Sequence, residues 1–146
     1  MSAPDLHPDT NPELIEDAYA FQRLLGFHLQ RWEDGLAELH QPVVPHIGNR
    51  YGLPHGGVHA ALLDTAMGFA GCWTGDPARK QLAMTLTLNV SYLSRPRGQT
   101  LIARGWVTGG GRKTFFCSGE IEDETGERIA TGSGAFRYRG AGKIMA

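Results

Sequence analysis

A histidine, two glycines and an aspartate share one short segment that reads NRYGLPHGGVHAALLD. They are His55, Gly56, Gly57 and Asp64, and Asn49 begins the segment. Apart from the histidines, Asp64 is the only charged residue between positions 51 and 75. A carboxylate in an uncharged apolar run is costly to bury unless it is paired, hydrogen-bonded or used in chemistry. These residue types and their spacing therefore mark the segment as the candidate site.

The chemistry open to these residues is that of an acyl group. Glycines at the start of a helix leave backbone N–H groups free, and the positive end of the helix dipole lies beside them. Such donors can hold a carbonyl oxygen and stabilise the charge of a tetrahedral transition state. A carboxylate can activate water, because aspartate, with an ordinary pKa of about 3.9, is ionised at neutral pH. Direct attack by Asp64 and activation of water by Asp64 both stay open.

The segment Val58 to Trp73 is predicted to be the helix that carries Asp64. At 100° per residue its bulky side chains fall on one side; they are Val58, Leu62, Thr65, Phe69 and Trp73. The face that carries Asp64 is otherwise formed by small residues, namely Gly57, Ala60, Ala61, Gly68 and Gly71. Small neighbours allow a ligand or another backbone to approach the carboxylate. Because this helix has no polar face, we expect it to be enclosed.

Around this helix the sequence predicts a second helix and six strands. Pro12 to Leu25 is expected to be a helix, with Asn11 as its N-cap and Gly26 as its stop. The predicted strands are Phe27–Trp32, Leu36–Val44, Leu82–Leu93, Thr100–Thr108, Thr114–Glu122 and Arg128–Tyr138. The last four follow one another through short turns and should be antiparallel neighbours. We therefore expect a loose leader over residues 1–11, and one α+β domain over residues 12–146 in which a sheet surrounds a helix.

The strand Leu82 to Leu93 has the clearest alternation in the chain. One face is apolar and consists of Leu82, Met84, Leu86, Leu88, Val90 and Tyr92. The other face consists of Ala83, Thr85, Thr87, Asn89 and Ser91. This pattern is typical of a strand with one apolar face.

Composition limits the classes of function. The chain has 146 residues, of which 41% are hydrophobic and 20% charged, as expected for one globular domain. A formal net charge of −1 gives no reason to expect nucleic acid or a membrane as a partner. Cys72 and Cys117 lie in apolar surroundings without a metal-ligand spacing, so we expect unpaired thiols in a reducing compartment. With no signal peptide in the sequence, we expect a cytoplasmic protein.

The order and spacing of the candidate residues resemble those of the hot-dog fold thioesterases of the phenylacetate-degradation (PaaI-type) family. The resemblance covers roughly residues 26–139 and rests on Asn49, Gly52, His55, Gly56, Gly57, Asp64 and the strand 85–93 with Ser94-Arg95-Pro96 after it. It implies a six-stranded antiparallel sheet wrapped around one long central helix, with an extra N-terminal helix. It also implies metal-free hydrolysis of acyl-coenzyme A (acyl-CoA) thioesters with no separate cofactor, since coenzyme A is part of the substrate. The active sites would lie at the interface of a homodimer, and the dimers would associate in pairs.

The resemblance also implies roles for individual residues. Asp64 would be the general base or the nucleophile, and the Gly56 N–H would polarise the thioester carbonyl. His55 and Asn49 would position the thioester and the water, and Thr85 would help to orient the water. Asp64 and Thr85 of one subunit would then face His55 and Asn49 of the other.

Basic residues are the candidates for contacts with coenzyme A phosphates, because lysine and arginine suit phosphate oxygens. They are Arg95, Arg97, Arg112 and Lys113, and Gly57 is a further candidate for substrate binding. Arg112 and Lys113 stand in the run TGGGRKT, which lacks the residue order of a phosphate-binding loop and is expected to be a hairpin turn. A solvated surface role is the alternative for each of these basic side chains.

Other functions stay open on the sequence. His55 and His59 are four residues apart, but the glutamate of a helical zinc-hydrolase motif is absent, so no metal is predicted. The absence of a Gly-x-Ser-x-Gly elbow disfavours a serine hydrolase. The hot-dog fold also hosts hydratases and dehydratases of acyl thioesters, and a non-catalytic acyl-CoA binding module is the other alternative. For Asp64 itself, the alternative is a structural hydrogen bond across a subunit interface.

Overall fold

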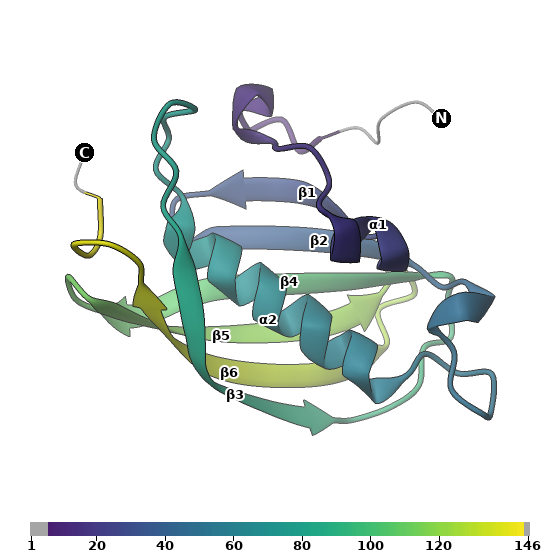
Figure 1. The fold of residues 1–146 in the computed structure, drawn as a ribbon. Coiled ribbons are helices and arrows are strands. Elements are labelled where there is room, and N and C mark those ends of the chain that lie inside the picture. Colours follow the sequence, from purple (N-terminus) through teal and green to yellow (C-terminus); the bar gives the residue numbers. More distant parts are fainter. Residues whose placement is uncertain (1–5, 145–146) are drawn as a thin grey trace.

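The computed structural model describes residues 6–144 and contains one six-stranded sheet and one long helix (Figure 1). The elements are η1 (Pro12–Leu14), α1 (Ala20–Leu25), β1 (His28–Glu33), β2 (Leu36–Pro42), η2 (Pro45–Ile47), α2 (Gly56–Cys72), β3 (Ala83–Tyr92), β4 (Thr100–Gly110), β5 (Thr114–Asp123) and β6 (Arg128–Tyr138). The strand order is β1-β2-β4-β5-β6-β3, and every pairing is antiparallel. The predicted fold class, an antiparallel sheet around one long helix, is confirmed.

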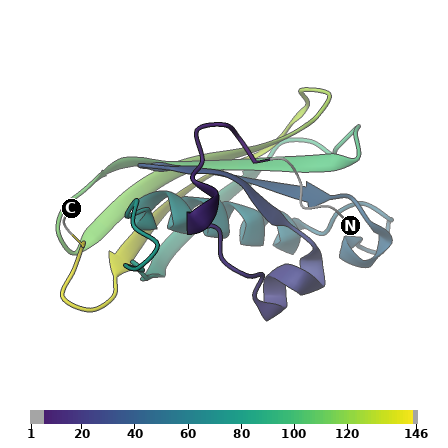
Figure 2. The same ribbon diagram turned by 90° about the horizontal axis from the view of Figure 1, so that it is seen from above.

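The core lies between α2 and the sheet, which curves around the helix (Figures 1 and 2). Fully buried side chains from both layers meet there, among them Leu62, Leu63, Met67, Leu101, Ile121 and Ile129. The crossing of α2 over β4 is so close that a Cβ on Gly105 would lie 2.6 Å from the Met67 backbone nitrogen. A glycine is therefore required at Gly105, and the helix backbone rests directly on the strand.

β3 lies at the edge of the sheet beyond β6, and the prediction that it would neighbour β4 is wrong. The segment 93–99 connects the two strands. It crosses three strand spacings, roughly 14 Å, which is well within its reach. Short connections favour neighbouring strands, but this one is long enough to skip two of them. β3 is consequently left with one unpaired edge.

A buried carboxylate holds this crossing in place. The Asp123 carboxylate is 1% exposed and accepts hydrogen bonds from the backbone N–H groups of Arg97 and Gly98 at 2.7 and 2.8 Å. The Thr125 hydroxyl and the N–H of Glu127 donate to the same carboxylate. Burial by itself would raise the pKa of Asp123, but these hydrogen bonds outweigh it and hold the pKa below its ordinary value. The turn before β4 is thus tied to the turn after β5.

The predicted alternation of β3 is broken by a β-bulge. Thr85 pairs with Phe136 and Thr87 pairs with Ala135, so Leu86 is an extra residue in the ladder. Before the bulge, Ala83 and Thr85 point toward α2; after it, the inward side chains are Leu88 and Val90. The prediction that Leu82, Met84 and Leu86 share a face with Leu88 and Val90 is therefore wrong. Leu82, Met84 and Leu86 are about half exposed, at 55%, 47% and 53%.

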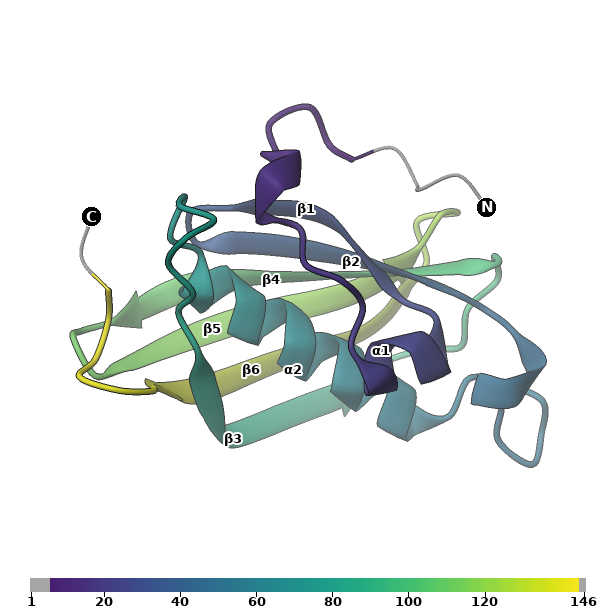
Figure 3. The same ribbon diagram turned by 45° about the horizontal axis from the view of Figure 1, so that its top comes forward.

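The predicted helix from Pro12 to Leu25 is also wrong over its middle part. Asn11 caps only the short η1, Gly26 ends α1 in the left-handed conformation as predicted, and the residues between the two helices are extended. We call Ile15–Tyr19 the crossing segment, because it passes from the β1 edge to the side of α2 (Figure 3). Burial of Leu14 and packing of Ile15 on the core override the helical spacing.

Part of the expected loose leader is attached to the sheet. The His7 N–H donates to the Gln30 carbonyl at 3.0 Å, and the Thr10 hydroxyl accepts from the Trp32 N–H at 3.0 Å. Residues 1–5 of that leader lie outside the described residues. None of the helices formed by residues 6–144 is long and apolar enough to cross a membrane.

Candidate active site

Asp64 is half-buried in the middle of α2 and is hydrogen-bonded to β3. The Thr85 hydroxyl donates to Asp64 Oδ1 at 2.6 Å. Thr85 precedes the bulge, so it points toward the helix while the next residue points away. The threonine thereby fixes one carboxylate oxygen, as expected of a residue that positions a general base.

An apolar cavity of about 330 Å³ opens beside this pair. Its polar lining groups are Glu16, Asp64, Thr65, Gln81 and Thr85, and its apolar walls include Tyr19, Trp32, Phe69, Leu82 and Phe136. The Trp32 indole N–H donates to the Phe69 carbonyl at 2.8 Å, which fixes one wall. A carboxylate at the edge of an apolar hollow is suited to act on a polar group attached to an apolar chain.

Tyr19 approaches the carboxylate from the crossing segment. Burial raises the pKa of Tyr19 above its ordinary value; a side-chain hydrogen bond with Thr65 opposes this rise, and the charge of Asp64 adds to it. The phenol therefore stays protonated at neutral pH and lies within electrostatic reach of Asp64.

The start of α2 offers one free backbone donor. His55 is the N-cap, and its Nδ1 accepts from the Gly57 N–H at 2.8 Å while its carbonyl accepts from the Val58 N–H. The Gly56 N–H has no acceptor among residues 6–144. It lies at the positive end of the helix dipole, where an anionic oxygen is stabilised.

Tyr92 fixes the peptide that follows this donor. Its hydroxyl donates to the Gly56 carbonyl at 2.7 Å, and a Cβ on Gly56 would lie 3.3 Å from its ring. The buried His59 ring lies against Tyr92, and its Nδ1 has no hydrogen-bond partner among the described residues. Burial, together with the charge of His55, holds the pKa of His59 below its ordinary value. His59 is therefore a neutral packing residue.

Asn49 organises the loop that leads to the start of α2. Its side-chain oxygen accepts from the N–H groups of Tyr51 and Leu53 at 2.9 and 3.2 Å. Within this loop Gly52 has a φ of 77°, which favours glycine. In one copy of the chain, Asn49 therefore acts on the loop, and its contact with substrate remains a prediction.

One copy does not bring all the candidate residues together. Asp64 and Gly56 are eight residues apart on the same helix, or about 12 Å along its axis at 1.5 Å per residue. That is too far for both to act on one thioester group. Asp64 and Thr85 form one half of the candidate site, and the loop from Asn49 to Gly57 forms the other.

The four candidate basic residues also lie in two places. Arg95 and Arg97 follow the end of β3, near the start of α2, and Arg97 forms an ion pair with Glu127 at 3.3 Å. Arg112 and Lys113 lie in the predicted hairpin turn between β4 and β5. This turn is at the opposite end of α2, where β5 packs on the helix (Figure 1). Within one copy the four side chains do not form a single phosphate site.

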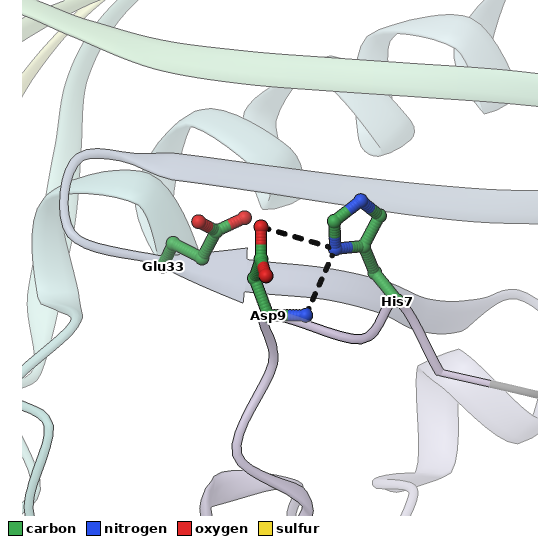
Figure 4. Close-up of side chains that lie close together, drawn as sticks. All are labelled: His7, Asp9 and Glu33. Carbon is green, nitrogen blue, oxygen red and sulfur yellow. Dashed lines mark hydrogen bonds and ion pairs between the residues drawn. The ribbon is translucent and has the colours of Figure 1, made fainter.

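A separate group of possible metal ligands lies between the residues that precede η1 and the end of β1. It consists of His7, Asp9 and Glu33 (Figure 4). His7 Nδ1 accepts from the Asp9 backbone N–H at 3.2 Å, and Arg31 forms an ion pair with Glu33. An ion would have to displace both interactions, so we assign the group no function.

Comparison with known proteins places this geometry in a family. A model of the thioesterase superfamily matches residues 51–130, which contain α2, β3, β4, β5 and the candidate residues His55, Gly56, Asp64 and Thr85. The chain belongs to the thioesterase superfamily. The predicted enzyme class, a thioester hydrolase, is confirmed at this level.

Known proteins are similar to this chain in sequence, in fold or in both. The medium/long-chain acyl-CoA thioesterase YigI of Escherichia coli K12 is 30% identical over 131 residues, covering 80% of this chain and 83% of YigI. The structure of BH2602 protein from Bacillus halodurans with CoA has a TM-score of 0.71 at 31% identity, covering 83% of this chain and 79% of that one. The PaaI protein of E. coli, from the phenylacetic acid degradation operon, has a TM-score of 0.72 over 84% of this chain and 86% of its own. At 21% identity it shows the fold alone.

Two residues of this thioesterase-superfamily site were missed by the sequence analysis. Tyr92 contacts the start of α2, but it was assigned only to the apolar face of a strand. Tyr19 lies beside Asp64, but it was assigned to a continuous helix. Neither contact has a local sequence signal, because each depends on where a distant segment crosses α2.

Proposed function

We propose that this protein hydrolyses acyl-CoA thioesters to a free acid and coenzyme A. The main support for the proposal is that Thr85 holds the Asp64 carboxylate at the edge of an apolar cavity. In this reaction Asp64 takes a proton from water as the water oxygen attacks the thioester carbon. The carbonyl oxygen, now negatively charged, accepts the Gly56 N–H. The C–S bond then breaks, and the coenzyme A thiolate leaves and takes up the proton that Asp64 accepted from the water.

We propose that two copies of the chain form each site. If the β3 strands of two copies pair antiparallel over their full length, Thr85 of one copy lies opposite Val90 of the other. Thr85 is then close to Tyr92 of the second copy, which is two residues after that Val90. Thr85 holds Asp64, and Tyr92 holds Gly56. The pairing therefore brings Asp64 of one copy toward the Gly56 N–H of the other, whereas one copy alone keeps them apart.

The surface of β3 supports this pairing. Half-exposed apolar side chains lie on the strand and directly beside its ends: Leu82 precedes it, Leu86 and Tyr92 belong to it, and Leu93 follows it. A long, apolar, unpaired edge is a site of association unless it is covered. A two-fold axis between the midpoints of the two β3 strands would relate the copies. Both free edges would then be covered, and two equivalent sites would form.

We propose an acyl group with a substantial aliphatic chain as the substrate. The cavity beside Asp64 is mostly lined by apolar side chains, and YigI, a relative, is named for medium- and long-chain acyl-CoA. Phenylacetyl-CoA, which only the name of the PaaI-type family suggests, belongs in the same test. We also propose that the dimers pair, as that resemblance implies, and that the protein resides in the cytoplasm, which its two unpaired cysteines support.

Thiol release from a panel of acyl-CoA esters tests the proposed activity. The panel contains straight-chain acyl groups of increasing length and phenylacetyl-CoA, and mass spectrometry identifies the products. Release of coenzyme A with the matching free acid is the expected result. Hydration of enoyl-CoA without thiol release would instead identify a hydratase. Thermal stabilisation by acyl-CoA without turnover would identify a binding module.

Mixing two inactive variants tests the shared site. When Asp64→Asn and Gly56→Pro chains are co-expressed, each mixed dimer has one intact site and one site that lacks both groups. With random pairing about half of the dimers are mixed, so roughly a quarter of all sites should be intact. The measurement is the rate of thiol release per total chain. Each variant expressed alone is the control. A mixture no more active than its components would contradict a site made by two copies.

A further inference from the structure

The crossing segment forms a partition between two apolar hollows. One is the 330 Å³ cavity beside Asp64. The other has a volume of about 280 Å³, and its walls include Phe27 and, from the sheet, Leu29 and Leu39. Glu16, Tyr19 and Phe69 line both hollows, and Phe69 is fixed in α2.

Both ends of the partition are anchored to the rest of the fold. Before it, Leu14 is buried and Thr10 is bonded to β1. After it, the buried Gln41 side chain donates to the Leu25 carbonyl at 2.6 Å, which ties the end of α1 to β2. An ion pair between Glu16 and Lys80 at 3.5 Å links the segment itself to the chain before β3. A segment held at both ends can serve as a wall of fixed position.

The Tyr19 ring occupies the boundary between the hollows. Its edge packs against Phe27, with ring centroids 6.2 Å apart, and its hydroxyl lies near Thr65, the residue after Asp64. Tyr19, which is 42% exposed, therefore has a neighbour on each side of its ring. An acyl chain that enters beside Asp64 meets this ring before it can reach the second hollow.

We propose that Tyr19 is a specificity-determining residue that sets the longest acyl chain the site accepts. This inference rests on the proposed hydrolysis of acyl-CoA thioesters. With the ring in place, the chain ends in the first cavity. Without the ring, the two hollows join and a longer chain can be buried. Each further buried CH₂ is worth about fourfold in kcat/KM, from about 0.8 kcal/mol per CH₂.

Substitutions at Tyr19 test this partition through the acyl-length profile. In Tyr19→Ala, the ratio of kcat/KM for long chains to that for short chains should rise about tenfold or more, as several CH₂ groups gain a buried position. Tyr19→Phe keeps the ring and should keep the parental profile. Tyr19→Trp enlarges the ring and should move the preference toward shorter chains. Phe21→Ala, at an exposed position that lines neither hollow, is the control and should leave the profile unchanged.

The outcomes separate this inference from the proposed function. A purely structural role for Tyr19 would lower the melting temperature and the rates for all chain lengths alike, without a shift of the profile. An unchanged profile in both Tyr19→Ala and Tyr19→Trp would overturn the partition. If Tyr19→Ala does not fold, Tyr19→Trp tests the partition alone: a shift of its profile toward shorter chains supports it, and any other profile overturns it. Failure of the parental protein to release thiol from any acyl-CoA would instead overturn the proposed function.

Discussion

Asp64→Asn should lower kcat for acyl-CoA hydrolysis about 10²–10⁴-fold, the usual contribution of a positioned general base. The amide has nearly the same shape as the carboxylate, and its oxygen can still accept the Thr85 hydroxyl that Asp64 Oδ1 accepts at 2.6 Å. It cannot take a proton from water. The substitution therefore removes the basic group and keeps the packing of the half-buried position. Steady-state thiol release measures the effect.

Asp34→Asn is the matched control for this variant. Asp34 is exposed in the turn between β1 and β2, where asparagine is equally favourable, so kcat should not change. Melting temperature and oligomer size should stay parental in both variants. Asp64→Asn with normal turnover would mean that the carboxylate is a structural hydrogen-bond partner.

Gly56→Pro should lower kcat about 10²–10³-fold, the usual effect of losing one donor to a developing oxyanion. Gly56 is the first residue of α2, where the missing N–H of proline breaks no helical hydrogen bond. The preceding residue, His55, has φ −64° and ψ 139°, a conformation that suits a residue before proline. The substitution therefore removes the free N–H with little effect on the helix.

Gly56→Ala provides the comparison that isolates the donor. Alanine and proline both place a Cβ about 3.3 Å from the Tyr92 ring, but only proline lacks the N–H. Gly56→Ala should keep most of the activity, and the ratio of the two kcat values measures the contribution of the donor. Equal losses in the two variants would assign the effect to steric contact with Tyr92. Circular dichroism establishes that both variants keep the helix.

The sequence predicted the elements of this fold better than their arrangement. The helix predicted from Val58 to Trp73 is α2, because hydrophobic spacing and flanking glycines are local signals. The place of β3 beyond β6 depends on the length of the segment 93–99 and on its bonds to Asp123, neither of which alternation reveals. The bulge at Leu86 likewise follows from sheet pairing. Local patterns do not contain such long-range contacts.

The candidate site was predictable to a similar extent. The sequence identified the Asp64 carboxylate by its position in an uncharged run, and the Gly56 N–H by the glycines at the start of α2. The structure adds the contact of Asp64 with Thr85. The catalytic roles of these residues stay predictions. Tyr19 escaped notice because the spacing from Pro12 to Leu25 suits a helix, whereas packing of Ile15 on the core keeps the segment extended. Side chains of this kind can be found only once the crossing is known.

The contact of α2 with Gly105 fixes the wall of the site that carries Asp64. A helix backbone seated on a strand backbone can neither slide nor rotate, and the contact falls at Met67, one turn from Asp64. The reactive group is therefore a stationary reference point. Evolution or engineering toward new acyl groups should accumulate changes in the crossing segment and leave the contact between α2 and Gly105 unchanged.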